Sequence, residues 1–445
     1  MGNEMIKEAK AVNKQGDKFY KNKQYTEAIK LYVESVKLMQ MAGEEKKASK
    51  YQEELDAAVG KQSEILNNEA DDLYKQKLYE EAIAKYQHAY DFLQKAGDKW
   101  IKKRGKEFLK ELNKSKVAFA KQVQETAEDH VKNHNWEEAN KIYRNVLSIV
   151  TPEVDEKMNK SMVHDQMTVY ERWAQEVNDK GDALYKEKNF EDAIQLYSEA
   201  VRLIEKSDNE KKKKSFKKEL SKAFTEHAEE INALGDKLMK EKEYMKASEL
   251  YAQSVNIATE AGNQKLIDNY TKEMNKAFEK FAQMINDKGD ELYKAKNYEE
   301  AAKIYENSVE VAKESKNKGL IKNFQKEYEK CLEKYAVEEN KLGDQFMKAK
   351  EFEKAMDKYK RSVNIVTRSG NAGKIKNFTA EYHKACLNLA KNINAEGDEL
   401  YKAKNYEEAY KLYDRSVELA EIAEDKGKIR SFSKERNKAL EKMNE

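Results

Sequence analysis

The stretch GDELYKAKNYEEAAKIYENSVEVAKESKNKGLIKNFQKEYEKCLEKYAVEENKL, residues 289–342, contains the pattern that decides the fold. Its apolar residues recur every three or four positions, and no proline interrupts them. This spacing is typical of amphipathic helices that bury one stripe of side chains. Turn-forming residues at Asn297 and at 316–319 divide the stretch into three segments. We therefore predict a unit of three helices, A, B and C.

The pattern recurs eight times along the chain. A glycine followed by an acidic residue stands at Gly16, Gly181, Gly235, Gly289, Gly343 and Gly397, and alanine replaces it at Ala70 and Ala127. Successive copies keep a 54-residue period, as from Gly235 to Gly289, except at one 57-residue step from Ala70 to Ala127. In every copy an aromatic residue, an alanine and a tyrosine follow nine, twelve and sixteen positions after this residue. Such regularity predicts a tandem array instead of separate domains.

We bound the eight units at the residue that lies three positions before the glycine or alanine. They are 1–66, 67–123, 124–177, 178–231, 232–285, 286–339, 340–393 and 394–445. The third unit is divergent, because it holds Trp136 and the only proline, Pro152. Thr151 before this proline favours a helix start, so we expect a break before helix C of that unit.

Nothing interrupts the helical phase between helix C of one unit and helix A of the next. We therefore expect each C–A pair to form one helix of about 30 residues, roughly 45 Å long. Short B helices would alternate with these long helices. The small residues Gly289 and Ala301 are expected to face each other across the A–B hairpin. The predicted fold is an all-α tandem helical-repeat array, an elongated solenoid or rod.

The composition agrees with long solvated helices. Charged residues make up 38% of the chain and apolar residues 39%, and the mean hydropathy is −1.03. Because 85 basic residues balance 83 acidic ones, the chain lacks the basic excess of a nucleic-acid binder. We interpret the one dense basic run, 211–214, as a solvated helix start. Cys331 and Cys386 stand at apolar positions, where buried thiols are expected.

Catalytic and targeting patterns are missing from the sequence. It has no glycine-rich phosphate loop, no Cys-x-x-Cys and no serine-nucleophile motif. His130 and His134 lie one turn apart, but no third zinc ligand accompanies them. No apolar run approaches the roughly 18 residues of a membrane span, and no signal peptide is evident. We expect a cytoplasmic protein that is not an enzyme and takes no cofactor or metal.

The order Gly-x-x-Leu-Tyr, Tyr-x-x-Ala and then Tyr, seen at 289–305, resembles the tetratricopeptide repeat. The match covers helices A and B of each unit, a little over half of its length, while the family's proline after the second helix is missing. The segment KAKNYEEA at 294–301, with its third helix, also looks like the microtubule-interacting and trafficking domain. Both resemblances imply helical modules that bind peptides or helices and that are not catalytic. The first implies a superhelix with a groove, and the second implies an extended rod.

A polar stripe recurs on helix A of each unit. Asparagine stands three positions before the glycine or alanine in seven units, at Asn13, Asn67, Asn178, Asn232, Asn286, Asn340 and Asn394, with Gln124 in the third. An acid follows four positions later, at Asp17, Asp71, Glu128, Asp182, Asp236, Asp290, Asp344 and Asp398. A lysine follows after four more positions, at Lys21, Lys75, Lys132, Lys186, Lys240, Lys294, Lys348 and Lys402. Spacing of four places the three types on one face.

This stripe has two interpretations. The acid and the lysine can form an ion pair along the helix, and the asparagine can bond to a neighbouring helix. Alternatively, the stripe can hold the backbone of a bound peptide. We take the asparagines, acids and lysines of units 4 to 8, from Asn178 to Lys402, as candidate partner-binding residues. Within the tetratricopeptide resemblance, the family's carboxylate clamp has asparagine where this chain has aspartate, which disfavours a chaperone adaptor.

We predict a non-catalytic repeat scaffold that mediates protein–protein interactions. The expected partners are other proteins that present an extended peptide, a helix or a lattice surface. An alternative is a structural component, or ruler, of a large cytoskeletal or ciliary assembly, because all eight units share one pattern. The last unit lacks an evidently polar cap, so docking of the ends onto partners or onto one another is also expected.

Overall fold

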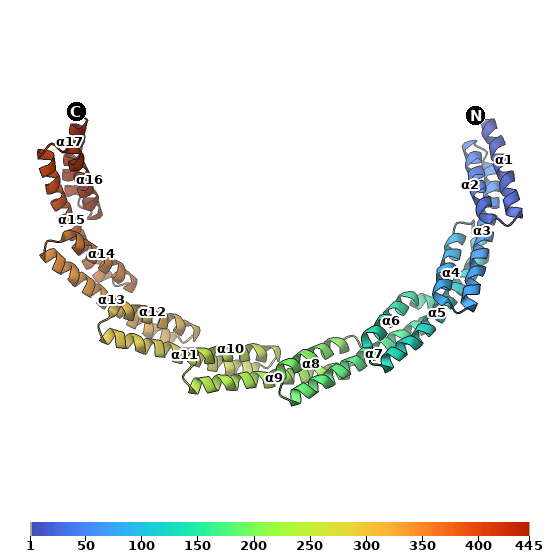
Figure 1. Ribbon diagram of the computed structural model, residues 1–445, viewed down its shortest axis with the longest axis horizontal. Coiled ribbons are helices and arrows are strands. Elements are labelled where there is room, and N and C mark those ends of the chain that lie inside the picture. Colours follow the sequence, from blue (N-terminus) through green and yellow to red (C-terminus); the bar gives the residue numbers. More distant parts are fainter. Residues whose placement is uncertain (1, 445) are drawn as a thin grey trace. The chain divides into compact units, whose positions relative to one another are not determined.

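The computed structural model describes residues 2–444, and within them it contains seventeen helices and no strand (Figure 1). The first nine are α1 (Gly2–Lys21), α2 (Tyr25–Met41), α3 (Glu45–Lys75), α4 (Tyr79–Leu93), α5 (Asp98–Lys132), α6 (Trp136–Ile149), α7 (Pro152–Lys186), α8 (Phe190–Ile204) and α9 (Glu210–Lys240). The others are α10 (Tyr244–Glu260), α11 (Gln264–Lys294), α12 (Tyr298–Glu314), α13 (Lys318–Lys348), α14 (Phe352–Ser369), α15 (Ala372–Lys402), α16 (Tyr406–Ile422) and α17 (Lys426–Met443).

Short and long helices alternate, which confirms the predicted fusion of helix C with the next helix A. The even-numbered helices have 14 to 18 residues and correspond to helix B. The long helices between them have 31 residues, or 35 in α5 and α7. Each long helix therefore begins in one unit and ends in the next. The chain is an all-α tandem helical-repeat array, as predicted.

The chain divides into two compact parts, residues 1–223 and 224–445, and the division falls inside α9. Within each part, every short helix packs against the long helices before and after it, and α8 and α10 each pack against the portion of α9 that belongs to their own part. The proposed boundaries of the eight units all fall within long helices, so no linker separates one unit from the next. No described helix combines the length and the apolar character that a membrane crossing requires.

The turn between helices A and B uses a left-handed backbone at a residue other than glycine. Lysine occupies this position with φ near +60° at Lys23, Lys77, Lys188, Lys242, Lys296, Lys350 and Lys404, and His134 occupies it in the third unit. This conformation costs an L-residue about 1–2 kcal/mol. The turn is held by backbone bonds such as Asn297 N–H to the Leu292 carbonyl at 2.9 Å. The packing of the two helices therefore stabilises a turn conformation that the lysine or histidine at this position disfavours.

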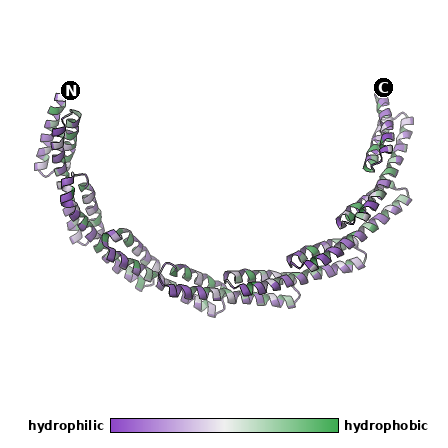
Figure 2. Cartoon of the chain, turned by 180° about the vertical axis from the view of Figure 1, so that it is seen from behind, coloured by the Kyte–Doolittle hydropathy of each residue, from purple (hydrophilic) through white to green (hydrophobic). Residues whose placement is uncertain are grey.

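The core of each unit is a narrow seam between helices. Figure 2 shows hydrophilic residues, in purple, along every helix of the cartoon. In unit 6, Ala301, Tyr305, Phe324 and Leu332 are buried together. A Cβ at Gly289 would lie 2.8 Å from the Tyr305 ring, so this tyrosine is the nearest side chain to the glycine, and the expected contact with Ala301 stays a prediction. A small residue, glycine in six units and alanine at Ala70 and Ala127, accompanies the recurring tyrosine, which is 2–3% exposed in all eight units.

The third unit breaks before helix C as predicted, but the working cap differs. Thr151 precedes Pro152 at the start of α7, yet its side chain does not cap the helix. Asp155 has a non-helical backbone (φ −160°, ψ 102°), and its carboxylate accepts a bond from the Met158 N–H at 2.8 Å. Pro152 therefore opens a short leading turn, and Asp155 caps the main part of the helix.

The 57-residue step is absorbed at the start of α5. This helix has 35 residues, and the added turn carries Trp100. The Trp100 ring lies so close to Gly60 of α3 that a Cβ at Gly60 would overlap it. The same ring lies near the Lys61 and Lys103 ammonium groups, at 5.9 and 5.4 Å. The Trp100 ring therefore packs units 1 and 2 against each other. This contact was not predicted from the sequence.

Candidate interaction surface

The asparagines of helix A are interior residues. Their exposed fractions lie between 2% and 8%. In each of the seven units the amide donates to a glutamate on helix C of the same unit, as Asn286 Nδ2 does to Glu327 Oε2 at 2.7 Å. The corresponding acceptors are Glu54, Glu111, Glu219, Glu273, Glu381 and Glu435, at 2.6 to 3.0 Å. Gln124 donates to Asp165 at 3.0 Å in the third unit.

A serine on helix B completes this contact in four units. Ser308 Oγ donates to Asn286 Oδ1 at 3.0 Å and shares its proton with the Tyr305 carbonyl at 2.7 Å. Ser35, Ser254 and Ser362 make the same shared bond to their own asparagines and tyrosine carbonyls. We call the serine, the asparagine and the acid the polar bridge of a unit. Because its members come from helices B, A and C, one buried amide ties all three helices together. Buried polar groups require such partners.

The bridge is incomplete in units 2, 4 and 8. Ala89 and Ala200 stand where units 1, 5, 6 and 7 have serine, and the carbonyl oxygens of Asn67 and Asn178 are buried without a hydrogen bond. In unit 8 the Ser416 hydroxyl donates to the Leu412 carbonyl instead, and Asn394 Oδ1 is likewise unpaired. A buried unpaired acceptor costs about 1–3 kcal/mol.

The acid of the stripe binds the recurring tyrosine. Tyr305 Oη donates to Asp290 Oδ1 at 2.5 Å, and six other units repeat this bond at 2.5 to 2.9 Å. Burial is the main cause that raises the pKa of Tyr305, and the bond to Asp290 raises it further. In the third unit Glu128 replaces the aspartate, and the described residues there form no such bond. The aspartates therefore stabilise the A–B hairpin.

The lysines are the one residue type of the stripe that is exposed to solvent in every unit. The expected ion pair with the acid four positions earlier is not formed within residues 2–444. Lys75, Lys132 and Lys402 instead pair with the acid three positions earlier: Asp72, Asp129 and Glu399, at 2.7 to 3.0 Å. In the seven units with aspartate, the physical reason is that the tyrosine hydroxyl already occupies the carboxylate.

The structure thus separates the candidate residues into two groups. Asn178, Asn232, Asn286, Asn340 and Asn394 lie inside their units, and Asp182, Asp236, Asp290, Asp344 and Asp398 receive tyrosine hydroxyls. A peptide would have to separate packed helices to reach the asparagines. Lys186, Lys240, Lys294, Lys348 and Lys402 are exposed and accessible to a partner.

The histidines and cysteines show no metal arrangement. No group of three or more potential metal ligands occurs among residues 2–444. His134 Nδ1 lies 2.6 Å from Glu176 Oε2, which also accepts from Trp136. The bond to His134 is the largest cause that lowers the pKa of Glu176 to about 2. Cys331 and Cys386 are free and buried, and burial raises the pKa of Cys331 to about 12.

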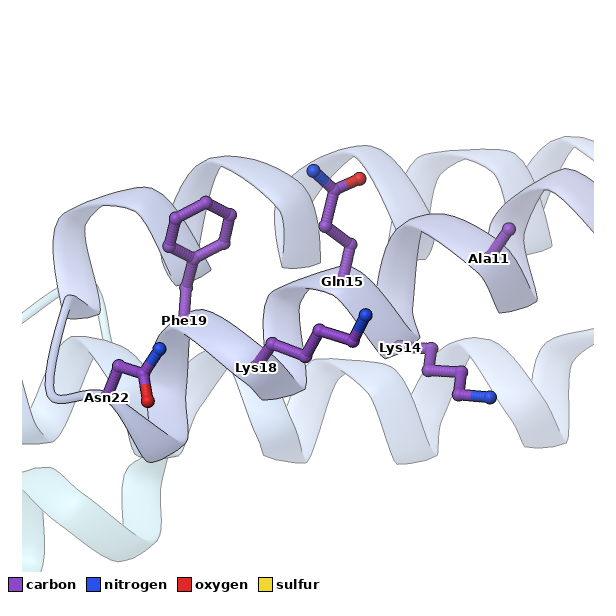
Figure 3. Close-up of a pocket in the computed structure, with 6 residues that line it drawn as sticks. All are labelled: Ala11, Lys14, Gln15, Lys18, Phe19 and Asn22. Carbon is purple, nitrogen blue, oxygen red and sulfur yellow. The ribbon is translucent and has the colours of Figure 1, made fainter.

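A surface hollow lies along α1. It is lined by Ala11, Lys14, Gln15, Lys18, Phe19 and Asn22, which come from this helix and the residue that follows it (Figure 3). No acid lies among its lining residues and only Phe19 is aromatic, so the hollow has no arrangement of acid, base or nucleophile. It adds nothing that resembles an active site.

Several residues of the bridge were missed by the sequence analysis. An acid follows the asparagine or glutamine by 41 positions in every unit except the second, where the separation is 44, and this regularity is visible in the sequence. The serines of units 1, 5, 6, 7 and 8 likewise keep one position. Both signals lie in segments where polar residues on helices are ordinarily solvated, so the spacing alone was not informative about burial.

Comparison with known proteins finds other tandem helical repeats. No protein-family model matches the chain, and no curated protein matches it. Solved structures that are similar include a circular tandem repeat protein with novel repeat topology, at 14% identity and a TM-score of 0.12, covering 94% of this chain and 95% of that one. The P58(IPK) tetratricopeptide domain is 13% identical with a TM-score of 0.13, covering 98% of both chains.

A third similar structure is the TPR2AB domain of yeast Sti1 in complex with pHSP90, at 15% identity and a TM-score of 0.14. It covers 73% of this chain and 99% of that one. These likenesses concern the fold alone, and the repeat architecture stands on the helices described above. None of the three is described as a microtubule-interacting and trafficking domain, so that resemblance stays a prediction.

Proposed function

We propose that this chain is a non-catalytic repeat scaffold that binds other proteins. The observation that carries the proposal is the division of roles within each unit. The recurring asparagines and acids of the stripe are engaged by the unit's own bridge and its tyrosine bond, as at Asn286 and Asp290. What repeats on the outside is a set of exposed charged side chains, including Lys294 and Lys296 at the A–B turn. A surface of this kind suits polar contacts with protein partners.

Cross-linking tests this function. The full chain is incubated with an extract of its source organism, cross-linked and analysed by mass spectrometry after a wash in about 0.5 M salt, where exposed charge pairs are largely screened. We expect a reproducible protein partner linked to lysines of the array. Recovery of the chain alone, at concentrations where control scaffolds capture their partners, would contradict the proposal.

A ruler in a cytoskeletal or ciliary assembly is the second candidate. The 54-residue period, with one exception of 57 residues, and the long helices that run from one unit into the next favour it, because a nearly fixed length per unit permits a regular spacing between bound partners. Deleting residues 232–339 removes two whole units and joins Ile231 to Asn340 in helical register. A ruler predicts that the spacing of its assembly shortens by a constant step. Unchanged spacing would leave only the binding role.

A further inference from the structure

The outer face of helix C carries three basic residues in every second unit, each four positions from the next. They are Lys106, Lys110 and Lys114 in unit 2; Lys214, Lys218 and Lys222 in unit 4; Lys322, Lys326 and Lys330 in unit 6; and Arg430, Lys434 and Lys438 in unit 8. All twelve side chains are exposed. We call each set a basic triple. Four positions of a helix rise about 6 Å, so a triple spans about 12 Å.

The odd-numbered units interrupt this pattern at the same positions. They carry Ser49, Glu53 and Ala57 in unit 1; Lys160, His164 and Thr168 in unit 3; Asp268, Lys272 and Lys276 in unit 5; and Lys376, Ala380 and Lys384 in unit 7. The complete triples therefore recur with a period of two structural units. The interior of the units does not require this doubled period, because the asparagine–acid bond is present in odd and even units alike.

The triples lack intramolecular acidic partners. None of the twelve residues takes part in an ion pair within residues 2–444, whereas nearby basic residues do: Lys217 pairs with Glu205 and Arg436 with Asp414. Like charges four positions apart on a helix destabilise it by a few tenths of a kcal/mol per pair. The folded chain therefore retains a repulsion that an acidic ligand would relieve.

In units 2, 4 and 6, one end of the triple lies over an aromatic ring. The ammonium groups of Lys114 and Lys222 lie 5.0 Å from the rings of Tyr74 and Tyr185 on helix A. In unit 6, Lys330 lies 6.0 Å from the Tyr293 ring. These cation–π contacts hold a long side chain over a half-buried tyrosine. A side chain that is already ordered loses less entropy when it binds a ligand.

We propose that each basic triple, in units 2, 4, 6 and 8, is a docking site for an acidic polypeptide segment. The inference rests on the proposed function and specifies the partner's chemistry. Charge complementarity carries it: between residues 98 and 121 the chain has nine basic and three acidic residues, although its net charge is only +2. Glutamate or aspartate side chains spaced three or four positions apart on a partner helix match the steps of about 6 Å within a triple.

The interrupted pattern favours a protein over a nucleic acid. A nucleic acid presents phosphates continuously and selects a continuous basic surface. Here Glu53 and Asp268 place carboxylates at triple positions of odd units, where they would repel phosphates. A partner with separated acidic segments avoids these positions.

The test uses the full chain and two variants with equal loss of charge. In the first, all twelve residues of the triples are changed to glutamine. In the second, twelve exposed lysines that lie outside the stripe and the triples are changed to glutamine: Lys30, Lys37, Lys141, Lys180, Lys237, Lys246, Lys288, Lys303, Lys313, Lys354, Lys360 and Lys391. The probe is a fluorescein-labelled 20-residue peptide rich in glutamate, titrated by anisotropy at 50 and 150 mM salt. Single-stranded RNA of 20 nucleotides is the competitor, and circular dichroism verifies that both variants are folded.

The triple variant is expected to bind the peptide at least about tenfold more weakly than the native chain, because each engaged triple loses three surface ion pairs. The second variant, which keeps every triple and every lysine of the stripe, is expected to stay within about threefold of the native chain. If both variants lose the same peptide affinity, net charge alone explains the binding, and the proposal is wrong. Tighter binding of RNA than of the peptide by the native chain would overturn it in favour of a nucleic acid.

Failure of this inference is distinguishable from failure of the proposed function. If cross-linking captures a protein partner equally with the native chain and the triple variant, the scaffold role stands and the triples are not its docking sites. If neither captures a partner, the scaffold role itself fails. Loss of capture in the triple variant alone supports both.

Discussion

Units 6 and 2 differ at a single position of the polar bridge, and the difference shows what the asparagine does. In unit 6, Ser308 donates to Asn286, which in turn donates to Glu327. In unit 2, Ala89 stands in place of the serine, and Asn67 keeps its bond to Glu111 but has an unpaired carbonyl oxygen. The constant part of the bridge joins helices A and C, while the serine is an addition that satisfies the buried amide. Each of the following experiments tests this comparison.

Removing the asparagine should have the largest effect, and a larger one in unit 6. Asn286→Ala loses one bond to a carboxylate and one from a serine, at a cost of about 3 kcal/mol. Asn67→Ala loses the first bond only and also removes an unpaired acceptor, so about 1–2 kcal/mol is expected. Hydrogen exchange of α12 in one variant and α4 in the other measures local opening, which suits a repeat array better than a global transition. Equal losses in both units would show that the serine contributes nothing.

Removing the serine should make unit 6 resemble unit 2. Ser308→Ala leaves Asn286 Oδ1 buried without a donor, and we expect a loss of about 1–2 kcal/mol in the protection of α12. Ser416→Ala in unit 8 is the matched control, because Ser416 bonds to the Leu412 carbonyl and not to Asn394. The control should lose about 0.5 kcal/mol or less. The comparison fails if the two substitutions are equivalent.

Adding the serine should repair units 2 and 4. Ala89→Ser and Ala200→Ser each place a hydroxyl where Asn67 and Asn178 lack a donor, and a gain of about 1 kcal/mol is expected. Ala193→Ser supplies the control, because this buried position of helix B faces no unpaired acceptor and should be destabilised. Exchange rates in α4 and α8 measure the outcome. A loss of protection at Ala89→Ser would mean that the cavity around Asn67 has no room for the hydroxyl.

The smallest expected effect is on pH dependence. Burial raises the pKa of Glu111 above its usual value of 4.5, and the bond from Asn67 only partly opposes this. A raised carboxyl pKa means that the folded unit binds the proton more tightly than the unfolded chain does. Its stabilising contribution is complete below the unfolded pKa and disappears as the pH rises through the folded pKa.

Trp100 reports this titration, because it lies in the same helix as Glu111. In a background with Trp136→Phe and Trp173→Phe, the urea midpoint from Trp100 fluorescence should rise slightly as the pH falls from 7 to 5. The Glu111→Gln variant should lack this part of the pH dependence. An identical pH profile in the variant would show that Glu111 does not cause this pH dependence.

The sequence determined the architecture but not the roles of its polar residues. The helical phase that continues through residues 266–296 predicted the fused long helices, because a helix is a local structure whose periodicity is visible in one segment. The burial of Asn286 depends on Glu327, 41 residues away, and on Ser308, 22 residues away. An i, i+4 ion pair between Asp290 and Lys294 was the natural local expectation, and it was wrong because Tyr305 reaches the aspartate from another helix. Rules that use only residues close in sequence do not include a competing hydrogen-bond partner from another helix.

The prediction made for Gly289 was limited in the same way. A small residue at Gly289 was correctly taken as a sign of close approach, but Tyr305 is the side chain that lies nearest to it. Which of two buried residues meets the glycine depends on the rotation of helix B about its axis. The alternation of basic triples was present in the sequence throughout, and exposure in the structure was needed to separate it from residues of the interior.

The shared long helices have a consequence for the chain under tension. A pulling force that reaches the end of α13 passes through one continuous hydrogen-bonded helix from unit 6 into unit 7, because no linker lies between them to extend first. When one unit unravels, the helix that it shares loses packing in the neighbouring unit as well. Neighbouring units are therefore expected to unfold together when the chain is stretched. The force is then shared by several units and does not act on the least stable unit alone.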